Sequence, residues 1–305
     1  MRRRGGTHRR DQRLGCLAPA RIKITARNPR NGCGPYSCPK GDPLALLTQN
    51  SELRRLRIHN WTIPAYAIRL SDGTTFNACP AAGACAKLCY ARNGTYNFPN
   101  VKAAHLRHLE HYLNDPEAWQ AEMNAELQSR RFRDRPDLPH LPHMSRAHLS
   151  ETVASALDRG AALIRIHDAG DFFSDEYLTA WLEIARANPG MLFYSYTKEV
   201  DRFRRLVVNN PPPNFLWTYS YGGKEDHLID PDTDRHTDVF PTVEALNAAG
   251  YYDQEDHDLL CVVAPTHRVG IVANNIPQFR KRQGDATFSE LELAKSARRR
   301  PKRAA

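Results

Sequence analysis

ALIRIHDAGDFFSDEYLTAWLEIARANPGMLFYSYT, residues 162–197, is the stretch that decides the fold class. Its two apolar runs, at 162–168 and 191–197, have the length and composition of buried strands. Between them, residues 174–190 have the apolar spacing of a helix, with Ser174 as the residue that caps its start and a proline-glycine pair at its end. A strand, a helix and a second strand at this spacing predict a right-handed βαβ unit and a parallel sheet.

The same alternation extends in both directions from this unit. Further strand-like runs lie at 62–71, 214–221, 259–265 and 268–274. They bring the total to about six strands separated by helical segments. We therefore expect one α/β domain over residues 61–275, built as a partial or irregular (β/α) barrel, with an open doubly wound sheet as the alternative. In both architectures, chemistry gathers at the carboxyl ends of the strands.

The charge is unevenly distributed along the 305 residues. Residues 1–30 carry ten Lys or Arg and one acidic residue, and residues 276–305 carry nine and three. The rest holds 24 basic and 30 acidic side chains, so the net charge of +9 resides in the two ends. We expect both ends to be disordered basic tails, with a loop-rich lead-in over 31–60 after the first. Such tails can bind phosphate backbones without sequence preference, and they can equally be solvated ends.

Two further features bear on the location of the protein. The sequence has no apolar run long enough to span a membrane, and no apolar segment follows the basic N-terminus as it would in a secretory signal. Seven cysteines, an odd number, without an export signal indicate a reducing compartment. We therefore predict a cytoplasmic protein without a membrane partner.

Three of the cysteines are crowded into one loop after the first expected strand. Cys79, Cys85 and Cys89 lie in NACPAAGACAKLCY, residues 77–90, with the spacing C-x5-C-x3-C. Clustered thiolates in a reducing compartment favour Zn²⁺ or an iron–sulfur cluster over disulfides. Three ligands leave one coordination position vacant, as in a [4Fe–4S] cluster whose fourth iron binds another molecule. An iron–sulfur cluster is the prediction we favour.

Other assignments of the thiols stay open. A structural zinc site would need a fourth ligand, either a histidine or one of Cys33, Cys38 and Cys261. The thiols can also be present without any ligand. The roles of Cys16, Cys33, Cys38 and Cys261 do not follow from their spacing.

Polar residues follow two of the central strands. Asp168, Gly170 and Asp171 lie after the strand at 162–168, where the carboxylates could bind a ribose hydroxyl or an ammonium group and the glycine would allow close approach. The alternative for the acids is ordinary capping of the next helix. Ser195 and Lys198, at the end of the next strand, could line a pocket or simply lead into a turn.

The cysteine loop resembles that of the radical S-adenosylmethionine enzymes. In that superfamily a three-cysteine loop follows the first barrel strand and an aromatic residue lies beside the last cysteine, as Tyr90 does here. The common spacing there is C-x3-C-x2-C. The resemblance implies a [4Fe–4S] cluster that binds the amino and carboxylate groups of S-adenosylmethionine. It further implies reductive cleavage to a 5′-deoxyadenosyl radical that acts on an unknown substrate.

A closer resemblance covers residues 60–220. NACPAAGACAKLCYARNGTY, IRIHDAGDFFSDEYLTAWLEIA and LFYSYTKE, in this order, are similar to segments of the gene product 88 family of phages and actinomycetes. That family has no well-established activity. It therefore leaves a second hypothesis open, a zinc-stabilised, non-enzymatic phage-type protein that binds nucleic acid through its basic tails.

Overall fold

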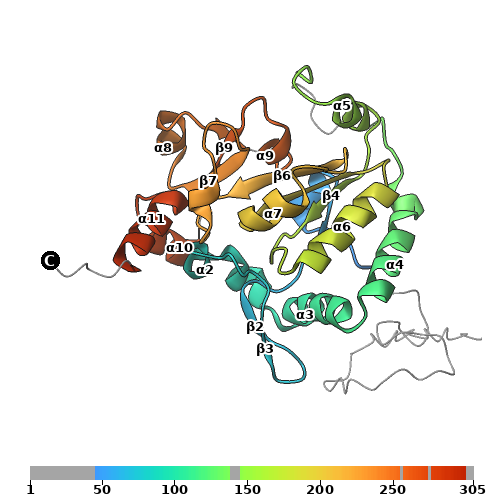
Figure 1. Cartoon of the computed structure of the whole chain (residues 1–305), viewed down its shortest axis with the longest axis horizontal. Coiled ribbons are helices and arrows are strands. Elements are labelled where there is room, and N and C mark those ends of the chain that lie inside the picture. Colours follow the sequence, from blue (N-terminus) through green and yellow to red (C-terminus); the bar gives the residue numbers. More distant parts are fainter. Residues whose placement is uncertain (1–44, 138–144, 255–256, 274–275, 300–305) are drawn as a thin grey trace, which may run out of the picture. The chain divides into compact units, whose positions relative to one another are not determined.

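The computed structural model describes residues 45–137, 145–254, 257–273 and 276–299, which all belong to one compact unit (Figure 1). The N-terminal tail and most of the lead-in that we predicted, residues 1–44, lie outside the described residues, so these predictions are not tested. No helix in the described ranges has the length and apolar character needed to cross a membrane.

The described residues contain a large sheet, a hairpin and helices on both faces of the sheet. The sheet strands are β1 Ile58–Trp61, β4 Leu163–Ile166, β5 Leu192–Thr197, β6 Phe215–Ser220, β7 His236–Phe240, β8 Tyr252–Asp253 and β9 Arg268–Val272. The hairpin consists of β2 Ala67–Arg69 and β3 Thr75–Asn77. The helices are α1 Ser51–Arg55, α2 Cys85–Leu88, α3 Pro99–Asn114, α4 Pro116–Leu127, α5 Glu151–Asp158, α6 Asp175–Ala187, α7 Val200–Leu206, α8 Val243–Ala248, α9 Leu260–Val263, α10 Pro277–Gln283 and α11 Phe288–Arg299. Short 3₁₀ turns lie at Tyr90–Arg92, Gly94–Asn97, Arg130–Phe132 and Asp226–Leu228.

The sheet is seven-stranded, in the order β1-β4-β5-β6-β7-β9-β8, and its neighbouring strands pair in parallel. The predicted α/β class with a parallel sheet is therefore confirmed. From β1 to β7 the strands lie side by side in chain order, so each crossover adds the next strand on the same side of the last. A doubly wound sheet would reverse its order in the middle, and this one does not. Within the described residues β1 and β8 are the two edges, so closure into a barrel is not seen.

Side chains of the central strands alternate between two apolar layers. Ile164 and Ile166 of β4 face the layer formed with α3, α4, α6 and α7, whereas Leu163 faces the layer formed with α5 and α9. Trp61 anchors the larger layer, where its indole N–H donates to the Tyr177 hydroxyl at 2.7 Å. Aromatic side chains bury about 150–250 Å² each and dominate the energetics of such a layer. The sheet is therefore held rigidly beneath the loops at its carboxyl edge.

The first sheet strand differs from the prediction at 62–71. The sheet uses β1, where all four side chains are buried, and residues 62–71 instead lead through Pro64 into the hairpin strand β2. Proline cannot donate to a ladder, which disfavours a central strand there. His59 and Asn60 are buried but polar, so the apolar pattern of β1 is concealed. Together with α1, β1 also shows that the end of the predicted loop-rich lead-in is ordered.

Two other strand assignments change near the C-terminal part of the sheet. The run at 259–265 is the short helix α9, because a short buried apolar run fits a helix as well as a strand. The strand β7 was not predicted, since its buried residues His236, Thr237 and Asp238 are polar. The predicted strands around β4, β5, β6 and β9 and the predicted helix around α6 are confirmed.

The C-terminal basic segment is not a disordered tail as far as residue 299. Residues 277–283 and 288–299 form α10 and α11, which lie beside α2 at the left of Figure 1. Phe279 and Phe288 are buried against Leu88 of α2 and Ala273. The prediction of a disordered tail was wrong here because a few apolar side chains among many charges suffice to dock a helix when its partner surface is preformed.

Candidate metal centre

The cysteine loop begins after the β2–β3 hairpin and is pinned to the end of β6. Cys79 follows β3, Cys85 begins α2, and Cys89 directly follows that helix. The backbone N–H groups of Gly83 and Cys85 both donate to the carbonyl of Gly222, each at 3.1 Å. The loop therefore lies at the carboxyl edge of the parallel strands, but it follows the β2–β3 hairpin and not the first sheet strand as we expected.

Gly83 allows the closest approach in this loop. A Cβ atom at this position would stand 2.2 Å from the Glu292 Oε2 atom and 2.7 Å from the Gly222 carbonyl oxygen. The Glu292 carboxylate of α11 also accepts a hydrogen bond from the backbone N–H of Ala84. The small residues of the loop thus let α11 and the β6 end close over it from two directions.

Two buried acids hold the beginning of the loop. The backbone N–H of Asp171 donates to the Ala78 carbonyl at 3.0 Å, and the Glu199 Oε1 atom accepts from the N–H of Ala81 at 2.8 Å. The Asp171 carboxylate itself accepts from the Thr197 hydroxyl and the Lys198 N–H, at 2.8 and 2.9 Å. Burial raises the pKa of both carboxyl groups, and Asp171 adds to the rise at Glu199. Asp171, which we predicted to bind a ligand, bonds to the end of β5 through its carboxylate and to the cysteine loop through its backbone N–H.

Lys198 acts on two of the thiols through its positive charge, and Arg92 also acts on Cys89. The Lys198 Nζ atom donates to the Ser220 carbonyl and hydroxyl and to the Tyr221 carbonyl, at 2.7–2.9 Å. These three bonds use all the protons of the ammonium group. Its charge nevertheless lowers the pKa of Cys85 and of Cys89, against the larger effect of burial. Lys198 therefore acts on the thiols through its field rather than as a contact for a ligand.

The three thiols share one electrostatic environment. Burial raises the pKa of Cys79, Cys85 and Cys89, in the last case to about 11. The charge of Asp171 adds to the rise at Cys79, and Cys85 and Cys89 add to it further. Three thiolates at this spot require a positively charged partner, which a metal centre would supply.

Asp168 bonds to other residues of the protein. Its carboxylate accepts from the Tyr96 hydroxyl, its backbone carbonyl accepts from the Tyr90 hydroxyl, and Arg165 lies 3.5 Å from the carboxylate. Tyr90 thereby ties the end of the cysteine loop to the end of β4. The predicted cofactor-binding roles of Tyr90 and Asp168 stay predictions, and the contacts assign both residues a structural role.

Gly170 and Ser195 are also explained by packing. Gly170 has a φ of +91°, and a Cβ atom there would stand 2.2 Å from the Ile63 side chain. Ser195 lies inside β5 with no exposed area, and its hydroxyl has no hydrogen-bond partner among the described residues. Neither residue reaches an open space, so their predicted binding roles stay predictions.

The structure does not add a fourth ligand to the three thiols. Cys261 is buried in α9, where Asp258, Tyr196 and Arg165 influence its pKa, so its neighbours differ from those of the loop. Cys16, Cys33 and Cys38 lie outside the described residues. Across the described ranges, no three Cys, His, Asp or Glu side chains are already gathered as ligands for one metal ion.

A single ion and a cluster would place three thiolates at different distances from one another. Zinc–sulfur bonds of about 2.3 Å bring the sulfur atoms of a zinc site to within about 4 Å of one another. The thiolates of a [4Fe–4S] cluster bind different iron atoms at separate corners and therefore stand further apart.

Sequence reasoning missed several residues that hold this site. Glu199 follows Lys198 directly in YTKE, and its position at a strand end was the available signal. Asp226 accepts from the N–H groups of Gly222 and Gly223, both at 2.8 Å, and burial raises its pKa to about 6. Glu292 gave no signal, since it lies in a segment that reads as a charged tail.

Comparison with known proteins places the chain in a family. A sequence profile described as gene product 88 matches residues 44–303. The chain belongs to the gene product 88 family. A curated relative, the gene 88 protein of Mycobacterium phage L5, is 34% identical to the chain over 139 residues. That match covers 44% of this chain and 48% of the relative, so the chain aligns with about half of the relative's length. No solved structure matches the chain.

The family assignment confirms the resemblance carried by the three sequence segments. The second resemblance, to radical S-adenosylmethionine enzymes, receives no support from these comparisons and stays a prediction. Membership of the gene product 88 family adds no established chemistry, so the activity must be argued from the site itself.

Proposed function

We propose that the protein holds a [4Fe–4S] cluster through Cys79, Cys85 and Cys89 and uses it with S-adenosylmethionine as a radical enzyme. The observation that carries the proposal is the loop with three cysteines that is hydrogen-bonded to the carboxyl ends of the parallel strands. With no fourth thiol beside them in the described residues, one iron of the cluster would be free to bind another molecule.

The strand order supports the same proposal. Parallel strands added one after another on the same side, from β1 to β7, follow the order of a partial (β/α) barrel. In such a barrel the loops after successive strands share one rim. Here the cysteine loop is bonded to the loops after β4, β5 and β6, through Asp171, Glu199 and Gly222.

The cluster would supply the electron that cleaves S-adenosylmethionine to methionine and a radical able to abstract hydrogen from a substrate. The residues of this chain have other tasks. Lys198 favours the thiolate forms of Cys85 and Cys89, and the Gly222 carbonyl fixes the turn between Cys79 and Cys85. The α11 helix, through Glu292, limits the access of water to the loop.

Anaerobic purification followed by iron, sulfide and zinc analysis tests the metal assignment. We expect about four iron and four sulfide per chain, with the broad visible absorbance of such clusters. Cys85→Ser should lose both. Cys261→Ala, which removes a thiol buried away from the loop, should keep both. Stoichiometric zinc without sulfide would instead establish the zinc-stabilised alternative and overturn the proposal.

A second assay separates the enzyme from a cluster-binding protein without activity. Reconstituted protein is incubated with S-adenosylmethionine and dithionite, which donates one electron for each molecule cleaved. Release of methionine and 5′-deoxyadenosine supports the radical chemistry. A loaded cluster without either product would leave the iron–sulfur assignment standing and refute the enzymatic part.

A further inference from the structure

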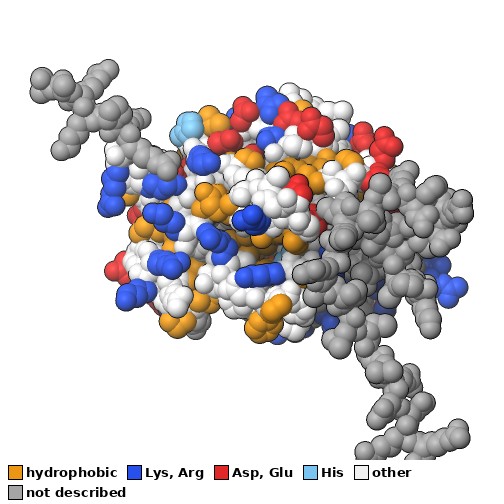
Figure 2. Space-filling model, turned by 90° about the horizontal axis from the view of Figure 1, so that it is seen from below, with side chains coloured by type: hydrophobic (Ala, Val, Ile, Leu, Met, Phe, Trp, Pro, Cys, Tyr) orange, Lys and Arg blue, Asp and Glu red, His pale blue; other side chains and the backbone are white. Residues whose placement is uncertain are grey.

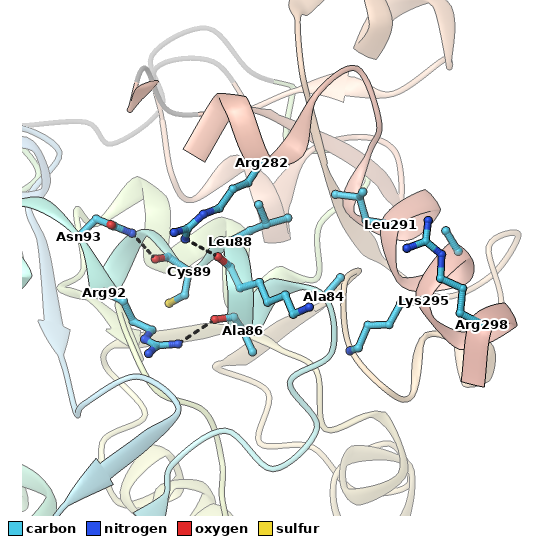
Figure 3. A pocket seen from close by; sticks show the side chains of 12 residues that line it. Ala84, Ala86, Leu88, Cys89, Arg92, Asn93, Arg282, Leu291, Lys295 and Arg298 are labelled. Atoms are coloured by element: carbon cyan, nitrogen blue, oxygen red, sulfur yellow. Dashed lines mark hydrogen bonds between the residues drawn. The ribbon is translucent and has the colours of Figure 1, made fainter. Parts of the chain in front are cut away.

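A large cavity lies between the cysteine loop and the C-terminal helix. It encloses about 1060 Å³ and is bounded by α2 and the residues after it, by α10 and by α11 (Figure 3). Cys89 forms part of its wall, so the cavity is continuous with the metal centre. None of the residues that we singled out from the sequence, other than Cys89, belongs to it.

The walls of this cavity are strongly basic. Its lining includes five cationic side chains and no acidic one, and we call it the basic groove: Lys87, Arg92, Arg282, Lys295 and Arg298. Lys295 is paired with the buried Glu292 at 3.0 Å. The other four are exposed, and within the described part of the chain none of them forms an ion pair with an acid.

The groove belongs to a wider basic surface. Lys and Arg side chains gather on the left of the face in Figure 2, the side on which Figure 1 places α2, α10 and α11. Acidic side chains lie mainly along the opposite, upper edge of that face. A concave surface with one sign of charge concentrates the field and attracts an anion of matching size.

Two of the arginines are held in place by the loop itself. Arg282 donates one N–H to the Lys87 carbonyl and Arg92 donates one to the Ala86 carbonyl, each at 3.1 Å (Figure 3). A guanidinium has five donors in a planar fork, so each side chain keeps donors for a ligand. This fork matches the oxygens of a phosphate better than a lysine ammonium does. The groove is therefore built for phosphate rather than for diffuse negative charge.

We propose that the basic groove binds the phosphate backbone of a nucleic acid without reading its sequence. No aromatic side chain lines the cavity, so it lacks the stacking surface that would hold a base or the adenine of a mononucleotide. Its volume lies at the upper limit of small-ligand sites. A chain of regularly spaced phosphates satisfies such an extended set of cations, whereas one small phosphate ester does not.

Binding of nucleic acid in the basic groove does not require the cluster, because α2, α10 and α11 form the walls of the groove without one. We infer further that the bound nucleic acid is the substrate of the enzyme, and this step rests on the proposed function, because only Cys89 connects the groove to that chemistry. The two claims therefore call for separate measurements.

Fluorescence anisotropy with a labelled single-stranded oligothymidine and the full chain tests the inference. The double variant Lys87→Gln/Arg298→Gln should bind severalfold more weakly at low salt. Its slope of log K against log salt should fall by about 1.4, about 0.7 for each lost phosphate contact. Arg54→Gln/Arg55→Gln removes the same charge from α1, which packs on β1 at the opposite edge of the sheet, and should bind as the unaltered chain does. Equal thermal unfolding of both variants confirms that the fold is intact.

Three outcomes decide between the alternatives. A second variant changes Arg2, Arg3 and Arg4 to Gln. If only this variant loses affinity for the oligonucleotide and the groove variant binds unchanged, binding belongs to the N-terminal segment and the inference is overturned. Groove-dependent binding of pyrophosphate without any binding of the oligonucleotide would overturn it in favour of a small phosphorylated ligand. Oligonucleotide binding retained by Cys85→Ser supports the inference even if the iron–sulfur proposal fails.

Discussion

At the scale of single residues, Gly83 is the position that sets how tightly the cysteine loop can close. A side chain there would collide with the Glu292 carboxylate and the Gly222 carbonyl. We expect Gly83→Ala to lower the free energy of unfolding by about 1–3 kcal/mol, the usual cost of overpacking. Denaturant unfolding measures this free energy. The iron content of the purified variant should fall as the stability falls.

Gly190→Ala is the matched control for this substitution. A Cβ atom at Gly190 meets no other atom within 4 Å, and its backbone is outside the left-handed region. It should change the free energy of unfolding by less than about 1 kcal/mol. Equal effects of the two substitutions would show that the loop has more room than the contacts around Gly83 indicate.

His108 makes the stability of the protein depend on pH. It stacks on Trp61 with ring centroids 4.5 Å apart, its Nδ1–H donates to the Thr62 carbonyl, and burial lowers its pKa to about 4. The unfolded chain protonates this ring near pH 6.5, whereas the folded chain does so only near 4, so stability present above 6.5 is lost as the pH falls. His108→Phe keeps the stack and should reduce the loss between pH 6.5 and 4 by about 3 kcal/mol. Urea unfolding at several pH values in this range measures the loss. If the free energy of unfolding falls equally with pH in the unaltered protein and in His108→Phe, the assignment to His108 is wrong.

The sequence predicted the three thiols of the site but not the residues that hold the cysteine loop in place. Three cysteines in eleven positions are informative because thiols have few other uses in a reducing compartment. Asp171 was recognised as unusual, but its position suggested a ligand, whereas its oxygens hold Thr197 and Lys198. Glu199 and Asp226 look like ordinary surface acids in the sequence. Their burial arises from loops that meet only in three dimensions, which a one-dimensional pattern does not encode.

At the scale of elements, Asp238 fastens α11 to the sheet. This buried carboxylate of β7 accepts from the N–H groups of Phe288 and Ser289, at 3.1 and 3.2 Å, and from the Ser289 hydroxyl at 2.5 Å. Asp238→Asn replaces one acceptor oxygen with a donor and should loosen the helix by about 1–3 kcal/mol. Hydrogen exchange of residues 288–299 should then become about tenfold faster or more.

The exposed Asp232→Asn provides the comparison for this experiment, since it makes the same chemical change at the surface. It should leave exchange in α11 unaltered. If the two variants exchange alike, the capping contacts do not determine how α11 is held. In that case the apolar contacts of Phe279 and Phe288 would carry the attachment.

The elements that could be predicted are those whose burial is apolar. The strands β4, β5, β6 and β9 are rich in aliphatic and aromatic residues, and α6 shows both its caps in the sequence. By contrast, β1 and β7 bury histidine, asparagine, threonine and aspartate, so their sequences lack the apolar run of a buried strand. The α11 helix was missed for a different reason. Its exposed face carries many charged residues, and only a few apolar residues mark the face that packs on the rest of the protein.

At the scale of the whole molecule, the cysteine loop is bonded to later parts of the chain after β4, β5 and β6 and in α11. Filling the site should therefore stabilise more than the loop. We expect reconstitution with iron and sulfide to slow hydrogen exchange at 79–89, at 220–226 and at 288–292, since Gly222 and Glu292 bond directly to the loop. Cys85→Ser treated in the same way should show no change. Protection limited to 79–89 would mean that the loop binds its metal independently of the sheet.

The parallel sheet was predictable as a class, but its strand order was not. Alternating strands and helices require parallel pairing whichever side each crossover takes. The side is chosen by packing against surfaces such as the Trp61, Trp119 and Trp181 cluster, whose members lie far apart in the sequence. The barrel that we favoured and the open sheet differ in the side on which each crossover places the next strand, and a local sequence pattern does not predict that side.

The bond from Glu292 to Ala84 joins residues 208 positions apart, and this has a consequence for biosynthesis. Because most strands pair with the one before them, much of the sheet can assemble as the chain leaves the ribosome. The cysteine loop, however, acquires its last wall only when the C-terminal helix emerges. Throughout translation the three thiols are therefore accessible to delivery factors and to oxidants alike. If the loop binds the proposed cluster, the site becomes complete only once α11 has docked on Ala84.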